Sequence, residues 1–369
     1  MCVAPWPGMP LDSPHRHREV ESAPGDRAFI AAFLATFLGV ACALAALVRI
    51  TDPLAVFGTG LLPPVVSADR DYKATLYRSA EPRPGVVVLG SSRVKTLRPA
   101  CIESLTGEPA FNFGVNAGVA EDYVAILRFM LAEPRFGVRE ILLGADPEAF
   151  TGEPGAGRAL HTSRILSRYA PPSAVGTRSV PATGLADLLA WENIAAAVRS
   201  LRRQYLPEAE LPQEAIASDG WQTHPRWDAE LAARDFPQGE RVRESVAAVR
   251  ARYRRELRLS PSRLLLLARL LQEAREAGVK VTAFIPPLHP DLERSLDAGS
   301  LPSLTAEMVG VLRDAERRGL LRYVHTSGVP GYSSDPSLYY DAVHMMAGNG
   351  DRLLTWLYRG GRERDCAVQ

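Results

Sequence analysis

The chain has 369 residues, enough for one large domain or two ordinary ones. Hydrophobic residues make up 46% of it and charged residues 23%, a balance typical of a globular protein rather than a disordered one. The formal net charge of +1 provides no overall basic field, so nucleic acid is not an expected partner.

An apolar run stands near the N-terminus. Met1 to Arg27 is polar and rich in Pro, His and Arg, and we expect it to be a disordered tail. Ala28 to Val48 contains no charged residue, and its 21 residues would span about 30 Å as a helix, the thickness of a hydrocarbon core. A buried soluble helix rarely stays apolar on every face for so long. The pattern therefore predicts a transmembrane helix rather than a cleaved signal peptide, whose apolar region is usually shorter.

The basic residues predict an orientation for this helix. Arg16, Arg18 and Arg27 precede the run, whereas Arg49 alone follows it before Arg70. Because cytoplasmic flanks carry the excess of basic residues, the N-terminus is expected in the cytoplasm. The remainder of this single-pass cell-membrane protein would then lie outside, in a periplasm or the extracellular space.

The four cysteines give no sign of a metal site. Cys2, Cys42, Cys101 and Cys366 lack metal-ligand spacing, and no phosphate-binding loop occurs, so we expect no metal and no cofactor. Cys101 and Cys366 are the two that could pair beyond the membrane, and the sequence leaves open whether they do.

A stalk and then an α/β domain follow the apolar run. Residues 49–84 have scattered Pro and Gly without a sustained period, and we interpret them as a stalk. Over residues 85–369, short apolar runs alternate with longer helical stretches, which predicts βαβ units and a mainly parallel sheet. The five expected strands are Val86 to Leu89, Ala110 to Phe113, Glu140 to Leu143, Val279 to Ile285 and Leu320 to His325.

The alternation breaks over residues 151–258, where no convincing central strand occurs. This stretch contains a predicted helix from Leu185 to Gln204 and a charged helix around Arg241 to Leu257. We interpret it as a largely helical insertion, which either caps the site or packs as peripheral helices. Connections this long are usually functional or disordered.

Two serines follow the first predicted strand. In an open α/β sheet, ligands bind beyond the carboxyl ends of the strands, which is where Gly90, Ser91 and Ser92 fall. A serine on such a turn is well placed to be a nucleophile. The same residues would also suit the N-cap of the next helix.

A possible base for such a nucleophile lies near the other end of the chain. A serine hydroxyl needs an adjacent base, and imidazole oriented by a carboxylate supplies one. Asp341 and His344 are three residues apart, so on one helical turn the carboxylate would reach Nδ1 and leave Nε2 for Ser92. Alone, such a pair is weak evidence, because it is more often a surface pair. Its combination with the Gly-x-Ser turn favours a triad of Ser92, His344 and Asp341.

The serine turn near the start of the domain and the Asp-x-x-His motif near its end resemble, in their order along the chain, those of the SGNH, or GDSL-type, serine hydrolases and acyltransferases. Gly90-Ser91-Ser92 resembles the nucleophile block, with Ser91 replacing the usual aspartate, and residues 112–118 resemble the second block. Asp341-Ala-Val-His344 resembles the last block. The resemblance implies a three-layer α/β/α, flavodoxin-like fold, acyl chemistry through a Ser92 ester, and an oxyanion held by the Ser92 and Gly118 amides. The resemblance covers the sheet-forming parts of the domain and not the insertion.

The third block departs from the family pattern. Asp146 stands where the family has an asparagine that donates to the oxyanion, a contact worth about 2.7–4 kcal/mol in comparable sites. An ionised carboxylate cannot donate. Four alternatives follow: Asp146 is protonated by desolvation, another group such as Asn116 donates, Asp146 holds Arg93 toward the substrate, or turnover is poor and the protein mainly binds.

The single anchor and the Gly-Ser-Ser start are similar to membrane-anchored members that move acyl groups on envelope polymers, such as D-alanyl transfer proteins of teichoic acid and alginate O-acetyltransferases. The resemblance implies an outward-facing esterase or O-acyltransferase acting on an acylated envelope glycan or another ester, alone or beside a membrane-bound acyltransferase. Two alternatives stay open: a non-catalytic glycan-binding or scaffold partner of such an acyltransferase, and an intracellular enzyme with a buried N-terminal helix.

Overall fold

The computed structural model describes residues 24–53, 59, 61–62, 69–152, 160, 163–171, 188–189, 191–206, 214–253, 257–295, 300–326, 335–360 and 366. The predicted disordered tail lies outside these residues except for 24–27, and so does the Leu185 end of the predicted insertion helix.

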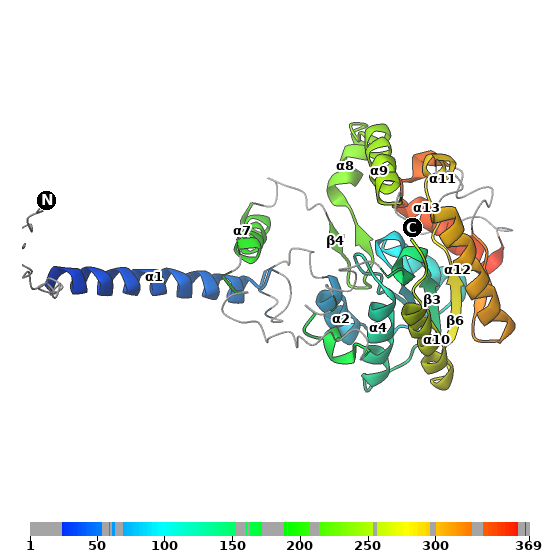
Figure 1. Ribbon diagram of the computed structural model, residues 1–369, viewed down its shortest axis with the longest axis horizontal. Helices are drawn as coiled ribbons and strands as arrows, with labels where there is room; N and C mark the ends of the chain where they lie inside the picture. Colours follow the sequence, from blue (N-terminus) through cyan, green and yellow to red (C-terminus); the bar gives the residue numbers. More distant parts are fainter. Residues whose placement is uncertain are drawn as a thin grey trace, which may run out of the picture.

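A parallel sheet forms the centre of the domain (Figure 1). Its five strands are arranged in the order β2-β1-β3-β6-β7, and every neighbouring pair is parallel, as predicted. Central strand β1 is buried at every residue, which is why it reads Val-Val-Val-Leu without alternation. The bounds are β1 (Val86–Leu89), β2 (Ala110–Asn112), β3 (Glu140–Gly144), β6 (Lys280–Phe284) and β7 (Arg322–Val324).

Helices cover both faces of the sheet and give the expected three-layer α/β/α arrangement. Apolar residues of α4 (Ala120–Ala132), α10 (Pro261–Glu276) and α12 (Ser300–Arg317) share one core cluster with Val87 and Leu89 of β1. Those of α3 (Pro99–Thr106) and α13 (Ala347–Arg359) share the other with Val86 and Val88. Shorter helical segments in the connections are η1 (Ser92–Val94), η2 (Pro147–Phe150), η3 (Leu166–Tyr169), α11 (Pro290–Ser295) and η4 (Pro336–Leu338).

Helix α2 (Asp69–Ser79) departs from the stalk interpretation. Its Tyr77 and Ala74 belong to the first core cluster, and the Tyr77 ring meets Phe111 of β2 edge-on at 5.5 Å. The region from residue 69 therefore packs as part of the α/β domain. The sequence concealed this because α2 buries polar side chains whose partners lie far along the chain.

The insertion between β3 and β6 contains the two predicted helices, as α7 and α9, together with helix α8 and a hairpin that the sequence did not predict. Its elements are α7 (Trp191–Tyr205), the antiparallel pair β4 (Ala215–Ile216) and β5 (Gln222–Thr223), α8 (Pro225–Ala232) and α9 (Gln238–Tyr253). The hairpin lies against the edge of β2, where the Asn112 amide donates to Asp219 O at 2.9 Å. Gly220, at φ +79°, approaches Asn112 O so closely that a Cβ there would collide with it.

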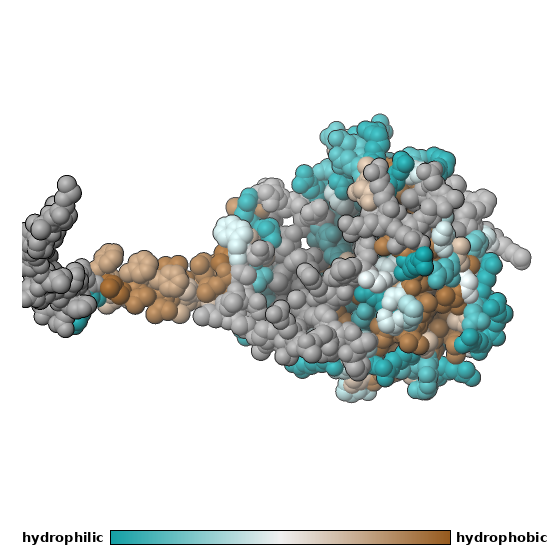
Figure 2. All heavy atoms as spheres, viewed as in Figure 1, coloured by the Kyte–Doolittle hydropathy of each residue, from teal (hydrophilic) through white to brown (hydrophobic). Residues whose placement is uncertain are grey.

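Helix α1 (Pro24–Thr51) projects from the domain as an apolar rod (Figures 1 and 2). Over residues 27–51 it is long and apolar enough to cross a membrane, and 6% of its most apolar window is buried. It is therefore not a buried helix of the described domain, which corrects the buried N-terminal helix of the intracellular alternative.

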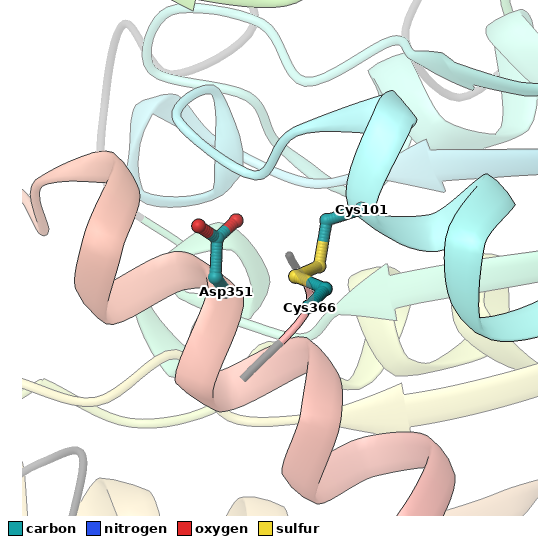
Figure 3. Close-up of side chains that lie close together, drawn as sticks. All are labelled: Cys101, Asp351 and Cys366. Carbon is teal, nitrogen blue, oxygen red and sulfur yellow. A yellow bond between two sulfur atoms is a disulfide. The ribbon is translucent and has the colours of Figure 1, made fainter. Parts of the chain in front are cut away.

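Cys101 of α3 and Cys366 form a disulfide across a sequence separation of 265 residues (Figure 3). Asp351 of α13 lies beside the two sulfurs. Its carboxylate accepts a hydrogen bond from Arg98 Nε at 2.9 Å. Because the sulfurs are joined and the carboxylate is paired, this cluster is not a metal site.

Candidate active site

The turn that carries Ser92 rests directly on the ends of three strands. Gly90 follows β1, Gly114 follows β2 and Gly144 ends β3, and all three face Val94 of η1. A Cβ on Gly90 would lie 2.7 Å from a Val94 methyl, and one on Gly114 would lie 2.8 Å from the same methyl. The glycines thus leave the room in which η1 sits and hold Ser92 at the carboxyl edge of the sheet.

The two serines of the turn have different partners. Ser91 is the N-cap of η1, since its Oγ accepts from the Arg93 amide at 3.2 Å, and its hydroxyl donates to Asp146. Ser92 is partly exposed, and its Oγ lies 2.9 Å from His344 Nε2. The N-cap alternative therefore describes Ser91, while Ser92 faces the imidazole.

The His344 ring is held on its other side by Asp341. His344 Nδ1 lies 2.8 Å from Asp341 Oδ2, while Asp341 Oδ1 accepts from the amides of Val343 at 2.8 Å and of His344 at 2.9 Å. The segment is a bend rather than the expected helical turn, and these amide bonds bring the two side chains together instead.

Asp341 is ionised at neutral pH. Burial raises its pKa, but the hydrogen bonds and charge of His344 and the bonds from the Val343 and His344 amides outweigh burial, so the pKa falls to about 2. A carboxylate there keeps the ring proton on Nδ1 and leaves Nε2 to accept from the Ser92 hydroxyl. Ser92, His344 and Asp341 can therefore pass a proton from the hydroxyl to the ring.

Asp146 holds Arg93, which is one of the four alternatives weighed for it. Arg93 Nη1 lies 2.5 Å from Asp146 Oδ1, and the two side chains are 6% and 2% exposed. Arg93 also donates to the Pro286 carbonyl, and Ser91 donates to Asp146. The guanidinium is therefore directed into the protein. The expectation that Asp146 would hold Arg93 toward a substrate is wrong in that respect.

The expected oxyanion donors differ in their availability. The Gly118 amide donates to Val115 O at 3.2 Å, in a turn where Ala117 has a φ of +46°. A Cβ at Gly118 would lie 2.9 Å from Gly90 O, so the turn packs closely against the nucleophile loop. Within the described chain the Ser92 amide has no acceptor, which leaves it available for an oxyanion.

Asn116 is engaged by a buried polar cluster that the sequence did not reveal. Its side-chain oxygen accepts from Lys95, and its amide donates to Asp69 of α2. Lys95 Nζ also lies 3.6 Å from Asp69 Oδ2, and burial lowers the pKa of this lysine. Asn116 thus supports the loop next to the site, because its side-chain oxygen and its backbone N–H are both engaged in this cluster.

Two buried cations of α2 hold the end of β2, the loop after it and the start of α4. Lys73 is fully buried and donates to Asn112 O at 3.0 Å and Gly114 O at 2.7 Å, and burial lowers its pKa to about 7. Arg70 donates to both carboxylate oxygens of Asp122, at 2.7 and 2.8 Å. Buried charges are costly unless they are paired, so these bonds are what allow α2 to pack here. One sequence contains no signal that would identify them.

The insertion contacts the nucleophile loop through its hairpin. The Gln222 amide donates to Lys95 O at 3.1 Å, and Trp221 Nε1 donates to Thr96 O at 3.2 Å. Both acceptors follow η1 directly.

The insertion also contacts the loop that carries Asp341 and His344. Tyr340 donates to Asp228 at 2.6 Å, and the Gln238 amide nitrogen donates to Tyr339 O at 2.7 Å. The rings of His224 and Trp227 stack at 4.3 Å, and Trp227 meets Tyr340 at 5.3 Å. The insertion therefore bridges the two loops of the site.

Comparisons with known proteins add little to this geometry. No protein-family model matches the chain, and no curated protein matches it. A solved structure provisionally described as a platelet activating factor from Streptococcus pneumonia is 10% identical, with a TM-score of 0.34 over 79% of this chain and 92% of that one. Another, provisionally described as an acylhydrolase from Bacteroides fragilis, is 10% identical, with a TM-score of 0.35 over 80% and 94%. Likeness this distant identifies no activity, so the site is interpreted from its own geometry.

Proposed function

We propose that the protein is a serine esterase or O-acyltransferase in which Ser92 is the nucleophile, His344 the base and Asp341 the residue that orients it. The observation that carries the proposal is the continuous contact from Ser92 Oγ to His344 Nε2 at 2.9 Å and from His344 Nδ1 to Asp341 at 2.8 Å. The resemblance of the four sequence blocks to SGNH enzymes supports the same chemistry.

In the proposed reaction, Ser92 Oγ forms a bond to the acyl carbon while His344 Nε2 takes the hydroxyl proton. The Ser92 amide donates to the oxyanion, and the Gly118 amide becomes a second donor once it leaves Val115 O. Collapse of the tetrahedral intermediate breaks the ester bond, and His344 returns the proton to the departing alcohol. Water or an acceptor hydroxyl then resolves the Ser92 ester by the same steps in reverse, giving hydrolysis or transfer.

The proposed location is outside the cytoplasm, with α1 as a single-pass anchor and the N-terminus inside. Basic residues precede the apolar run, and the Cys101–Cys366 disulfide is of the kind that persists in oxidising compartments. Acylated envelope glycans are the substrate class that the anchored SGNH relatives suggest, with a membrane-bound acyltransferase as a partner.

The test uses the full chain in detergent with p-nitrophenyl acetate and a fluorophosphonate label. Ser92→Ala should abolish labelling and lower hydrolysis by at least about 10³-fold, because the nucleophile is removed. Ser104→Ala, a control on α3 where the hydroxyl donates to Cys101 O at 2.8 Å, should leave both unchanged. A Ser92→Ala protein that hydrolyses and labels like the parent would overturn the proposal.

A second candidate is a non-catalytic glycan-binding or scaffold domain. It is favoured by the Asp146–Arg93 ion pair at the position where the family has a donor asparagine, and by the bond from the Gly118 amide to Val115 O. A parent protein that never reacts with fluorophosphonate but binds an acylated glycan would support this candidate.

A further inference from the structure

Helix α7 of the insertion carries an apolar stripe that faces solvent. Trp191, Val198 and Tyr205 are 75%, 45% and 72% exposed, and Ile194 and Leu201 between them are partly exposed. These five residues recur at helical spacing and therefore form one face. A soluble domain rarely leaves such a continuous apolar face uncovered.

A neighbouring face of α7 packs against α1. Among the residues whose burial is described, the buried ones of α7 are the small Ala196, Ala197 and Ser200, and those of α1 are Ala45, Val48 and Thr51. The two helices are in contact, and Figure 1 shows α7 end-on beside the C-terminal part of α1, so that the helices cross. Small side chains permit this close approach.

The contact fixes the depth of α7 relative to the membrane candidate. Ala45 lies six residues before Thr51, the end of α1, which corresponds to about 9 Å along the helix. If α1 spans a bilayer, α7 lies within the outer boundary between headgroups and acyl chains, where amphipathic helices bind.

The rotation of α7 about its axis suits the same location. With about 100° per residue, the apolar stripe and Arg199 lie on opposite flanks of the face that contacts α1. For a helix lying across α1, one of these flanks faces the bilayer and the other faces away from it, so the apolar stripe and the exposed Arg199 can take opposite sides. Arg202, also exposed, borders the apolar stripe at the level of anionic headgroups.

We propose that α7 is a membrane-surface helix that inserts its apolar stripe, Trp191, Ile194, Val198, Leu201 and Tyr205, into the leaflet on the side of the α/β domain. The occupant of the stripe is an anionic lipid surface. The insertion then has one end on the bilayer and the other on the loops of the candidate active site, which holds the site close to the membrane. This inference does not depend on the chemistry proposed for Ser92.

The test measures quenching of Trp191 by lipid. The full chain is placed, one copy per disc, in nanodiscs of equal parts phosphatidylcholine and phosphatidylglycerol, with bromine near the glycerol end of the acyl chains. The Trp191 signal is the difference in fluorescence between the parent and Trp191→Phe. It should fall by about half or more in brominated discs, because the ring lies among the acyl chains. Bromine near the methyl ends should quench it less.

The controls separate the other occupants. Trp356→Phe, on α13, should leave the brominated-lipid quenching unchanged. Quenching of the Trp191 signal by aqueous iodide, with none by brominated lipid, would mean that the stripe faces water and would overturn the proposal. Protection from both quenchers would mean that protein covers the stripe and would overturn it as well. Stronger quenching by deep bromines would refute the surface location.

Discussion

Replacing Asp146 by asparagine would create the residue that the SGNH pattern has at this position, yet we expect it to harm the protein. The carboxylate is the counter-ion of Arg93, and both side chains are almost completely buried. Removing one partner of a buried ion pair costs about 3–5 kcal/mol, because the remaining charge stays without water or a counter-ion. Asparagine can still accept from Ser91 and Arg93, so we expect the lower end, about 3 kcal/mol. Hydrolytic activity should fall rather than rise.

The matched control is Asp314→Asn, which makes the same chemical change on the surface of α12. Asp314 pairs with Arg317 and Arg318, and the side chains are 42%, 72% and 69% exposed, so its loss should cost less than about 1 kcal/mol. Urea unfolding of the full chain in detergent, followed by circular dichroism, measures both changes. If Asp146→Asn unfolds at the same urea concentration as the control, or gains activity, Asp146 is not the counter-ion that the structure indicates.

Three further predictions concern pH and packing. Because the pKa of Asp341 is lowered to about 2, the ionised carboxylate contributes fully to stability above about pH 4. As the pH falls toward 2, the free energy of unfolding of the parent should drop by about 2 kcal/mol relative to that of Asp341→Asn. Parallel pH curves for the two proteins would contradict this prediction. The pKa of Lys73 is lowered to about 7, so between pH 7 and 9 the unfolded chain holds more protons than the folded one. The free energy of unfolding of the parent should therefore rise over this range relative to that of Lys73→Met. A difference between the two proteins that does not change with pH would refute this. Gly144→Ala should destabilise by about 1–3 kcal/mol through its collision with Val94, and adding Val94→Ala should restore part of the loss in the same urea assay.

The sheet could be predicted because its inner strands β1, β3 and β6 are almost entirely buried and therefore read as short apolar runs between helical stretches. The juxtaposition of Ser92 with His344 was also expected, since the residues that follow parallel strands gather at one edge. In each case a local pattern identified a strand or a motif, and the parallel sheet brought the motifs together.

The polar parts of the structure could not be predicted in this way. Helix α2 has no apolar period, and the bidentate partner that stabilises Arg70 in the interior is Asp122, 52 positions away. The strands of the hairpin have two residues each, too few to show an alternating pattern. The engagement of Gly118 with Val115 is set by a left-handed residue at Ala117, which nothing in its side chain favours.

The disulfide has a consequence for a chain that has been nicked. Any cut between Cys101 and His344 yields a fragment that keeps Ser92 and another that keeps His344, and the disulfide still joins them. A protease acting on the surface of the insertion would thus produce a two-chain molecule that runs as one band until a reductant is added. Because the two fragments cannot diffuse apart, packing alone keeps Ser92 and His344 in contact in the cleaved form.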